Sequence, residues 1–532
     1  MAKTMPSPAT SIRSYLTSHL NKTMTKPSST VLENPGRRRL LGNGIATTGG
    51  VLGILGTSES LAGEARQHWD REFDVIVVGC GLAGASAAYE AARSGAVVLV
   101  LDSGGAAANA SHGTIIYMGG GTGLQKACQI EDTPEAMMKY LLASTGPDPD
   151  TGRIRVFVER SVANYDWLVS LGVPFSNAPD NLSLEYSGSE KVYPWREMIR
   201  PVPRGHIPDV PGSKSLYRGG GAWIQKRLLD GARSAGAATP LNAVARRIVR
   251  GHDGVVQGVV ATIDGRSFSF RARRGLILAT GGFAHNKEMV SEHAPIYLGC
   301  TPTDLKWNDG WGIRAAQSVG AAVRRMGSAG AGWYFYHPAS RRQGVLVNAQ
   351  GQRFISEDSY SGRVGDAIVR EQHGIAYLIV DRTIMDDGAS TVIPDAIAAQ
   401  AASIADLEGL LGIPAPALQQ TLDTYNTYAT KGQDPLFHKA LEHLRPLSQG
   451  PFTAINASVG KSRVSFFTLG GVHTTPGAEV LDTEGKTIPK LYAVGRVSAG
   501  IPCPYYYSSG LNLGECITFG RIAGIGAARN RT

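Results

Sequence analysis

The sequence predicts an α/β fold, and three neighbouring features that begin near residue 71 support it. Residues 73–78 (FDVIVV) form a short, β-branched run with one charge, as expected of a strand buried on both faces of a parallel sheet. A glycine-rich turn follows at residues 79–84 (GCGLAG), and small residues over 85–94 favour a helix. A second apolar run at residues 96–101 completes a β-α-β unit of the Rossmann-like type.

The turn between the first strand and the helix has the composition that a dinucleotide pyrophosphate requires. Glycines permit a tight turn and close backbone approach, and the helix N-terminus that follows favours negative charge. The second strand ends at Asp102, whose carboxylate can accept hydrogen bonds from ribose hydroxyls. On this unit alone, both FAD and NAD remain open. We expect the dinucleotide to contact Gly79, Gly81, Leu82, Ala83, Gly84, Asp102 and Ser103.

Length and composition indicate a globular chain with more than one domain. The 532 residues are 42% hydrophobic and 18% charged, and a single domain rarely exceeds about 250 to 300 residues. Part of the formal net charge of +9 lies in residues 1–70, which hold eight Lys/Arg and four Asp/Glu. No basic stretch interleaved with aromatic residues follows, so we expect no nucleic-acid partner.

Residues 1–70 have the composition of an export signal rather than of a folded domain. A polar stretch precedes Arg37, Arg38 and Arg39, and a Gly-rich, weakly apolar run follows over 40–61. This pattern resembles a twin-arginine signal, with a small-residue cleavage site at 63–65, and predicts a periplasmic or exported protein. The alternative is a disordered basic tail on a cytoplasmic protein. Because polar residues interrupt the run over 40–61, we expect no stable transmembrane helix.

The cysteines give no sign of a disulfide framework or a metal site. They are odd in number and widely spaced, and no CxxC or CxxCH motif occurs, which disfavours disulfide pairing, a zinc site and an attached c-type haem. We therefore expect no metal, and an electron acceptor or donor that is not part of this chain. The cysteines are Cys80, Cys128, Cys300, Cys503 and Cys516.

Further segments resemble the FAD-binding flavoproteins of the fumarate reductase and succinate dehydrogenase superfamily. The resemblance extends from about residue 72 to 529 and is closest to its 3-ketosteroid dehydrogenases, of the Δ4-(5α) or Δ1 type. It implies FAD rather than NAD, although relatives usually carry Glu where Asp102 stands. The segments that carry it are 109–113 (NASHG), 117–122 (YMGGGT), 278–283 (LATGGF), 308–313 (NDGWGI), 491–495 (LYAVG) and 510–514 (GLNLG).

The resemblance implies non-covalent FAD and further contacts to it. Some members of the wider superfamily tether FAD through a histidine near the position of His112, but relatives usually carry glycine there, so we expect a packed or solvent-touching imidazole. The additional cofactor-binding residues that we expect are Ala110, Ser111, Gly113, Gly120, Gly121, Val244, Thr280, Gly281, Asp309, Gly495, Gly510, Leu511, Asn512 and Leu513.

The resemblance also implies a Rossmann-like FAD-binding domain that is split in sequence, at 71–330 and 455–532. An α+β capping domain is inserted at 331–454, and the reacting cleft is expected where the two parts meet. Residues 344–348 (GVLVN) have the pattern of a strand, and the alanines and leucines over 396–411 recur at helical spacing.

One motif departs from the pattern of fumarate-type enzymes, which place a proton-donating arginine a few residues after an RFxxE motif. Here residues 353–363 read RFISEDSYSGR, so the expected position of the arginine falls on Ser361, after Tyr360. A shifted loop would still let Arg363 take that role. Segment 502–510 (PCPYYYSSG) also lacks the His and Arg that clamp substrate carboxylates, which disfavours a dicarboxylate substrate.

The tyrosines of segment 502–510 suit an apolar ketone better than a dianion. In 3-ketosteroid dehydrogenases, a tyrosine hydroxyl and a glycine amide hold the 3-keto oxygen, and another tyrosine takes the proton. The resemblance is to the branch that acts at C4 and C5 of 3-oxo-5α-steroids, with Ser509 as an alternative to Ser508 as helper and Tyr117 on the flavin side. The alternative is that these aromatics only pack a domain interface. The catalytic candidates are Tyr360, Tyr506, Tyr507, Ser508, Gly510 and Tyr117.

We therefore expect an FAD-dependent oxidoreductase acting on CH–CH groups, which converts a 3-oxo-steroid or a similar bulky, apolar cyclic ketone into an α,β-unsaturated ketone. A polarised carbonyl acidifies the α-hydrogen, a tyrosine takes that proton, and the β-hydrogen leaves as hydride to flavin N5. Because an ordinary tyrosine pKa is about 10, a hydrogen-bonded chain of tyrosines must lower it or relay the proton. The alternatives are an exported reductase of an unsaturated acid, such as fumarate or urocanate, and a flavoprotein electron carrier.

Overall fold

The computed structural model describes residues 68–104, 113–176, 184–185, 202–211, 219–240, 242–303, 305–333, 338–388, 396–502 and 504–530. Contacts divide the chain into Met1–Arg66 and Gln67–Thr532, and every described residue belongs to the second unit. The expected signal sequence therefore lies outside the described residues, as do Ala110, Ser111, His112 and Cys503.

Among the described residues, the largest sheet is built around the predicted β-α-β unit. Its order is β18-β19-β8-β1-β2, and an antiparallel ribbon of β7 and β6 continues from β8. β1 runs parallel to both β2 and β8, with Val78 opposite Leu101 and Leu278, and β8 runs parallel to β19. Both predicted strands are confirmed. The bounds are β1 (Arg71–Val78), β2 (Val98–Leu101), β6 (Ala243–Arg250), β7 (Val256–Ile263), β8 (Arg266–Leu278), β18 (Glu479–Leu481) and β19 (Thr487–Ala493).

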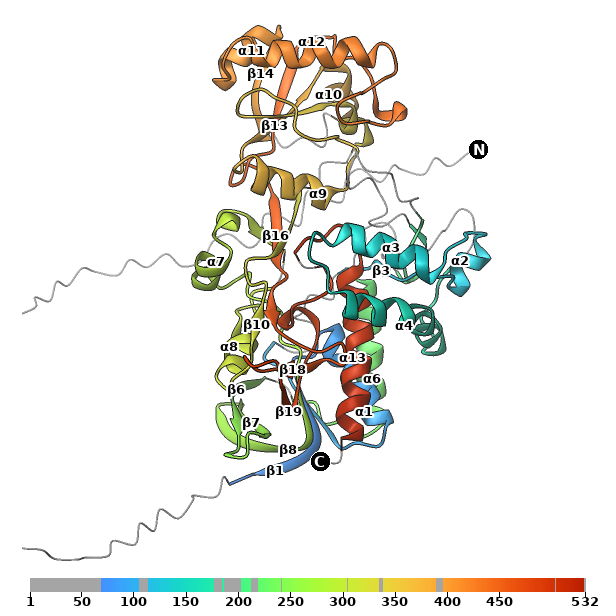
Figure 1. Cartoon of the computed structure of the whole chain (residues 1–532), viewed down its shortest axis with the longest axis vertical. Helices are drawn as coiled ribbons and strands as arrows, with labels where there is room; N and C mark the ends of the chain where they lie inside the picture. The colour runs from blue at the N-terminus through green and yellow to red at the C-terminus, as the bar shows by residue number, and fades with distance from the viewer. Residues whose placement is uncertain are drawn as a thin grey trace, which may run out of the picture. The chain divides into compact units, whose positions relative to one another are not determined.

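Helix α1 (Leu82–Arg93) packs against α13 (Leu511–Arg529) and α6 (Gly220–Ser234), as Figure 1 shows at the lower right. The predicted helix is confirmed, and it begins directly after the glycine turn. Small residues allow α1 and α13 to approach closely, because a Cβ on Gly524 would overlap the carbonyl oxygen of Ala87. This packing fixes the N-termini of both α1 and α13 near the carboxyl ends of the sheet strands.

The segment after β2 forms a small sheet of order β3-β5-β4 and several helices. A buried ion pair stabilises it, because Arg204 Nη2 lies 2.5 Å from Asp132 Oδ1 and both side chains are fully buried. The elements here are β3 (Ile116–Tyr117), α2 (Gly123–Ala127), α3 (Pro134–Ser144), α4 (Thr151–Ser170), β4 (Leu184–Glu185) and β5 (Gly205–His206).

Two paired strands lead from these elements to the segment expected to form the cap, residues 331–454. The chain enters the cap after β11 (Ala329–Trp333) and returns through β16 (Val464–Thr468), which is labelled in Figure 1 and pairs antiparallel with β11. The neighbouring elements are α7 (Lys287–His293), η2 (Pro295–Tyr297), β9 (Thr301–Pro302), α8 (Trp311–Gln317), β10 (Val323–Arg324), β17 (Gly471–Val472) and η8 (Gly495–Val497).

The cap contains an antiparallel sheet of order β12-β13-β15-β14. The strand expected at 344–348 is confirmed as β12, while β15 crosses the boundary expected at 454. Its elements are η3 (Ala339–Gln343), β12 (Val345–Asn348), α9 (Ser361–Asp366), the π-helix η4 (Ala367–Glu371), β13 (Ala376–Val380), α10 (Arg382–Gly388), β14 (Ile397–Ala401), α11 (Ile404–Leu411), α12 (Ala417–Ala429), η7 (Leu441–His443) and β15 (Phe452–Asn456).

The expected helix over 396–411 is wrong in its first part, where β14 forms instead. The residues of β14 alternate between partly buried and exposed, and the strand pairs antiparallel with β15, so sheet pairing overrides the helical spacing of the alanines. The helix begins only at Ile404, where the Ser403 hydroxyl accepts a hydrogen bond of 3.1 Å from the Asp406 amide and caps it.

The RFxxE motif forms a buried charge cluster that holds the segment leading to Tyr360. Arg353 donates from Nε and Nη2 to Glu357 at 3.0 and 2.8 Å, and its Nη1 donates to Asp434 at 2.9 Å. The ammonium of Lys439 lies 2.8 Å from the same Glu357 carboxylate. The cluster combines two cations with two carboxylates, so its charges balance although its side chains are buried.

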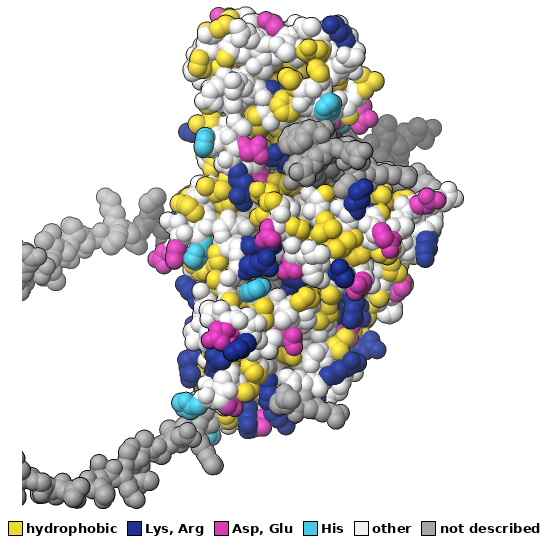
Figure 2. Space-filling model, in the orientation of Figure 1, with side chains coloured by type: hydrophobic (Ala, Val, Ile, Leu, Met, Phe, Trp, Pro, Cys, Tyr) yellow, Lys and Arg dark blue, Asp and Glu magenta, His cyan; other side chains and the backbone are white. Residues whose placement is uncertain are grey.

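On the face shown in Figure 2, Lys and Arg side chains lie among Asp and Glu side chains. Among the helices that the structure describes, none is both long and apolar enough to cross a membrane. In the described part of the chain, His, Cys, Asp and Glu side chains form no group that could hold a metal ion.

Candidate active site

A cavity of about 890 Å³ lies at the carboxyl ends of the parallel strands of the largest sheet. Its wall includes Val78 and Leu101, which end β1 and β2, and Ala279, which follows β8. Open α/β sheets bind ligands at this edge, and the volume is within the roughly 300 to 1,000 Å³ of ligand pockets. The expected cofactor residues on its wall are Gly79, Gly81, Leu82, Ala83, Asp102, Ser103, Gly113, Val244, Thr280, Gly281, Asp309, Gly495, Gly510, Asn512 and Leu513.

The glycine turn has the geometry that a dinucleotide requires. Gly79 has a φ of +97°, which only glycine adopts without strain. A Cβ on Gly84 would overlap the carbonyl oxygen of Gly79, so this glycine lets α1 pack against the turn and does not itself line the cavity. At Gly81 a Cβ would meet no protein atom within 4 Å, since this residue faces open space. The three glycines therefore have three separate roles, as the fingerprint predicts.

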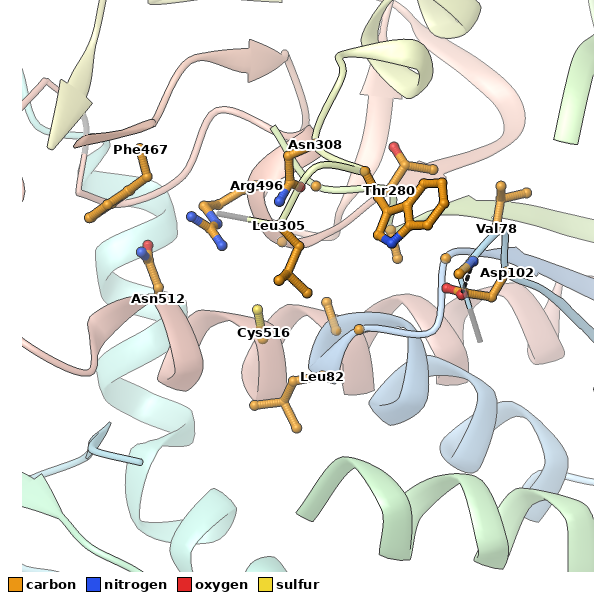
Figure 3. A pocket seen from close by; sticks show the side chains of 18 of the residues that line it. Val78, Leu82, Asp102, Thr280, Leu305, Asn308, Phe467, Arg496, Asn512 and Cys516 are labelled. Carbon is orange, nitrogen blue, oxygen red and sulfur yellow. Dashed lines mark hydrogen bonds between the residues drawn. The ribbon is translucent and has the colours of Figure 1, made fainter. Parts of the chain in front are cut away.

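Asp102 lies at one end of the cavity and is already oriented by the backbone (Figure 3). Its Oδ2 accepts a hydrogen bond of 2.8 Å from the Cys80 amide, and its Oδ1 accepts one of 3.0 Å from the Gly104 amide. A carboxylate has about four lone-pair sites, so acceptor capacity remains for ribose hydroxyls.

The second glycine loop, residues 279–281, packs directly against the turn at Gly79 and forms another part of the cavity wall. The buried hydroxyl of Thr280 lines it and has no protein hydrogen-bond partner, so a bound ligand can supply one. Gly281 has a φ of +79°, and a Cβ there would overlap the side chain of Asn308. Asp309 accepts a hydrogen bond of 2.9 Å from the Trp311 amide at the start of α8. Cavity shape, donors and acceptors together fit FAD.

Helix α13 begins at Leu511, and Figure 3 shows Asn512 of its first turn on the opposite side of the cavity from Asp102. Gly510, with a φ of +83°, caps the helix, and Asn512 and Leu513 line the cavity. The Gly510 amide donates a hydrogen bond of 3.0 Å to the hydroxyl of Tyr506, which also lines the cavity. Gly510 and Tyr506 are both catalytic candidates from the sequence, and the structure places them within hydrogen-bond distance of each other.

Several expected cofactor residues do not line the cavity. Gly120 and Gly121 donate from their amides to Asp132 and Gln125, at 2.8 and 3.0 Å, and so belong to the buried ion-pair segment. Leu511, in the first turn of α13, is fully buried in the protein core. Ala110 and Ser111 lie outside the described residues.

The tyrosines of the C-terminal segment and of the cap come together in one cluster. Tyr360 and Tyr507 are both buried and pack together, with Tyr505 against them. The hydroxyls of Tyr360 and Ser509 lie 2.6 Å apart, and Ser509 lines the cavity. Tyr507 points into the cap instead, where its hydroxyl donates to Asp366 at 2.8 Å. Tyr360 and Ser509 therefore connect the cap to the cavity wall.

Ser508 and Tyr117 are buried in the protein and are not on the cavity wall. The Ser508 hydroxyl lies 3.3 Å from that of Ser144 on α3, and both side chains are buried. Tyr117 is fully buried, its ring stacks on Tyr140, and burial raises the pKa of its phenol to about 12. The expected role of Tyr117 on the flavin side is thus not supported by its position.

The arginine of the fumarate-type pattern is also placed elsewhere. Ser361 begins α9 and is buried, and Arg363 Nη1 lies 2.7 Å from the carboxylate of Glu371. Burial lowers the pKa of the Arg363 guanidinium, but nearby Tyr507 and Glu371 outweigh burial and raise it above its usual value. Arg363 is not on the cavity wall, so the shifted-loop alternative has no support in this geometry.

Sequence reasoning missed several side chains that line the cavity. Arg496 directly follows Gly495 in the closing segment, so its position was a usable signal, while Phe467 and Trp307 belong to segments without a recognisable motif. The missed residues include Arg246, Thr303, Leu305, Trp307, Asn308, Trp311, Phe467, Arg496 and Cys516, whereas Ser509, expected as an alternative helper, does line the cavity.

Comparison with known families agrees with this geometry. A family model described as an FAD binding domain matches residues 74–513, which is more than half of the chain. The chain belongs to this FAD-binding family. Its cofactor is FAD, and the flavoprotein is an FAD-dependent oxidoreductase.

Solved and curated relatives include both steroid dehydrogenases and fumarate reductases. The crystal structure of 3-ketosteroid-Δ4-(5α)-dehydrogenase from Rhodococcus jostii RHA1, in complex with 4-androstene-3,17-dione, is 38% identical with a TM-score of 0.80; the match covers 88% of this chain and 99% of that one. The 3-oxo-5-alpha-steroid 4-dehydrogenase of Comamonas testosteroni is 28% identical over 80% of this chain and 93% of its own. The fumarate reductase (cytochrome) of Shewanella frigidimarina is 29% identical over 86% and 77%.

Proposed function

We propose that this flavoprotein dehydrogenates a 3-oxo-steroid, or a similar bulky cyclic ketone, to an α,β-unsaturated ketone. The observation that carries the proposal is the 2.6 Å contact between the hydroxyls of Tyr360 and Ser509, which joins the cap to the cavity wall. The likeness to the Rhodococcus enzyme, crystallised with 4-androstene-3,17-dione, supports the same substrate class.

In the proposed reaction, hydroxyl groups on the cavity wall hold the ketone oxygen of the substrate. Tyr506, Ser509 and Gly510 line the wall beside the start of α13. Because the Gly510 amide donates to the Tyr506 hydroxyl, it polarises that hydroxyl and makes it a stronger donor to a ketone. Polarisation withdraws electrons from the α-carbon, so its hydrogen becomes more acidic.

The proton of the α-carbon then passes to the hydroxyl oxygen of Ser509 on the cavity wall, while the proton of that hydroxyl moves to the tyrosinate form of Tyr360, 2.6 Å away. FAD, held by the glycine turn at Gly79 and by Asp102 and Thr280, would supply the acceptor for the hydride of the β-carbon. One C–H bond therefore yields a proton to the protein and the other yields a hydride, and a C=C bond forms between the two carbons. Turnover needs an electron acceptor outside this chain, which we propose as the partner of the reduced enzyme.

A dicarboxylate reductase is less well supported by the site. Its proton donor would have to be an arginine near the reacting carbon, but Ser361 occupies the aligned position and Arg363 pairs with Glu371. The charges on the cavity wall include no pair of cations at the α13 end that would clamp a dianion, among the lining residues that the structure describes.

The experiment is anaerobic mixing of the purified holoenzyme with saturated 3-oxo-steroids, followed through the visible absorbance band of oxidised flavin. Bleaching of that band, with formation of a conjugated enone, is the expected result. No bleaching by any ketone, together with rapid reoxidation of the dithionite-reduced enzyme by fumarate or urocanate, would overturn the proposal. A saturated steroid without the 3-oxo group serves as the control, since its hydrogens are not acidified.

We further propose that the chain is exported through a twin-arginine signal, on the pattern of Arg37, Arg38 and Arg39 before the weakly apolar run. Cell fractionation should then place flavin-loaded protein in the periplasm or medium. A variant with Arg38→Lys and Arg39→Lys should remain in the cytoplasm with its FAD bound, because folding precedes export. Periplasmic protein at the parental level from this variant would contradict the proposal.

A further inference from the structure

Asn308 is a buried residue whose side-chain carboxamide faces the cavity. It is 6% exposed and lines the cavity, where Figure 3 shows it between Arg496 and Thr280 with its nitrogen directed inward. Within the part of the chain that the structure describes, no group forms a hydrogen bond with this carboxamide. Most buried polar groups in proteins do have a partner. The side chain of Asn308 is therefore available to a ligand that fills the cavity.

The backbone of Asn308 holds this side chain in place. Its N–H donates a hydrogen bond of 2.9 Å to the Leu305 carbonyl, and its own carbonyl accepts one of 3.1 Å from the His285 amide. The carboxamide oxygen packs against Gly281, because a Cβ there would overlap Oδ1 but would lie 3.7 Å from Nδ2. The Nδ2 group, which can donate two hydrogen bonds, is thus the part of the carboxamide that is left to the cavity.

The loop that carries Gly281 places Asn308 beside the turn that suits a pyrophosphate. A Cβ on Gly79 would overlap the carbonyl oxygen of Ala279, so the turn and the second glycine loop are in direct contact. Helix α1 begins at Leu82, directly after this turn, and its first amides favour negative charge. The oxygens of an ionised pyrophosphate accept hydrogen bonds and donate none. A donor from Asn308 therefore matches the part of FAD that belongs at the glycine turn.

We propose that Asn308 donates a hydrogen bond from Nδ2 to a pyrophosphate oxygen of FAD. This bond forms only when the cofactor enters, so the carboxamide contributes to FAD binding and little to the folding of the apoprotein. Because the backbone bonds to Leu305 and His285 fix the residue beforehand, little conformational entropy is lost on binding. The role of Asn308 is the same whichever ketone or acid the enzyme acts on.

ADP carries the adenosine and both phosphates of FAD but no ribityl chain or flavin, so it tests this contact without turnover. We expect Asn308→Ala to raise the dissociation constants of FAD and of ADP for the apoprotein by the same factor, roughly tenfold or more, as for a hydrogen bond to a charged group. Asn308→Asp keeps the shape of the side chain but places a carboxylate against the diphosphate, so it should raise both constants further. Isothermal titration calorimetry of the apoprotein would measure both ligands.

Asn164→Ala is the matched control, because Asn164 is also buried but its carboxamide is paired within the protein. Its Nδ2 donates to the Thr518 hydroxyl at 2.8 Å, its Oδ1 accepts from Arg521 at 2.7 Å, and it is not on the cavity wall. The control variant should lower the urea midpoint of the apoprotein more than Asn308→Ala does, and it should leave the affinity for ADP unchanged.

Weaker FAD binding by Asn308→Ala with unchanged ADP affinity would place the contact on the flavin side of the cofactor and overturn the inference. Parental affinity for both ligands in Asn308→Ala would overturn it too. The same holds for parental ADP affinity in Asn308→Asp, and for equal losses of ADP affinity or of apoprotein stability in the two alanine variants.

Discussion

The hydroxyl of Tyr507 donates a hydrogen bond of 2.8 Å to the carboxylate of Asp366, which joins the C-terminal tyrosine segment to α9 of the cap. The other oxygen of Asp366 accepts from Arg370 Nε at 2.6 Å, and the Tyr297 hydroxyl lies 3.3 Å from it. Tyr505 stacks on Tyr507 with ring centres 5.4 Å apart. A buried carboxylate between a phenol and a guanidinium thus links the C-terminal tyrosine segment to the cap.

Asp366→Asn should lower turnover by roughly five- to tenfold, because a hydrogen bond to a carboxylate is stronger than one to an amide by about 1 kcal/mol. Burial raises the pKa of Asp366, against the opposing effect of Arg370 and Tyr507. As the pH falls, the carboxylate therefore takes up a proton earlier than an exposed aspartate, and turnover should decline on the acid side. That acid limb should be absent from the pH profile of the variant.

FAD content provides the control for Asp366→Asn, since Asp366 does not line the cavity. The flavin spectrum and the dissociation constant of FAD should stay at their parental values. If the acid limb persisted unchanged in the variant, the decline would have to be assigned to another group.

Tyr360→Phe should reduce turnover by about 10² to 10⁴-fold, the usual contribution of a positioned proton-transfer group. Its hydroxyl lies 2.6 Å from that of Ser509, and phenylalanine keeps the ring but removes this contact. FAD binding should be retained, because Tyr360 is not on the cavity wall. Steady-state rates with a saturated 3-oxo-steroid and an artificial electron acceptor would measure the loss.

Tyr505→Phe is the matched control for Tyr360→Phe. The change is chemically the same, and the ring can keep both its stacking on Tyr507 and its contact with Arg370. Turnover should stay within a few fold of the parental value. Comparable losses in the two variants would indicate that the tyrosines only pack the interface.

Elements that are determined by the local sequence could be predicted, whereas an element that is determined by pairing with a strand distant in the sequence could not. The strands β1 and β2 and the helix α1 follow from apolar runs and a glycine turn that have only one consistent structure. The alanines of β14 fit a helix equally well, and only the pairing with β15, about 50 residues later, decides for a strand.

The candidate site shows the same division. Residues in glycine motifs, such as Thr280 and Gly510, line the cavity as expected, because backbone approach is encoded in the glycine itself. Gly120 also belongs to a glycine motif, but its amide donates a hydrogen bond to Asp132, twelve residues later in the sequence. The partners Ser509 and Asp366 depend on how the cap sits against the C-terminal segment, which no local pattern records.

Gly84→Ala and Gly81→Ala should separate folding from cofactor binding. A Cβ at Gly84 would overlap the carbonyl oxygen of Gly79, so Gly84→Ala should destabilise the apoprotein by about 1 to 3 kcal/mol. A Cβ at Gly81 meets no protein atom within 4 Å, so Gly81→Ala should leave the free energy of unfolding within about 0.5 kcal/mol. It should nevertheless weaken FAD binding at least tenfold. Urea unfolding and FAD titration would measure both, and equal stability losses would refute the distinction.

The buried side chain of His206 should make the free energy of unfolding depend on pH. The ring is fully buried, its Nδ1–H donates to the Arg204 carbonyl at 3.1 Å, and its Nε2 lies 2.8 Å from the Thr122 hydroxyl oxygen. Burial lowers its pKa from 6.5 to about 4. Between pH 6.5 and pH 4 the unfolded chain binds a proton on this histidine that the folded chain does not. The contribution of His206 to the free energy of unfolding is therefore complete above pH 6.5 and is lost as the pH falls towards 4.

The loss attributable to His206 should reach about 3 kcal/mol near pH 4, at 1.36 kcal/mol for each unit of pKa difference. His206→Gln keeps an amide donor and acceptor but cannot titrate. In urea unfolding measured from pH 7 to pH 4, the variant should therefore lack this part of the decline, although it starts from a lower stability at pH 7. If the variant showed the same slope as the parental protein over the whole range, the acid sensitivity would have to be assigned to groups other than His206.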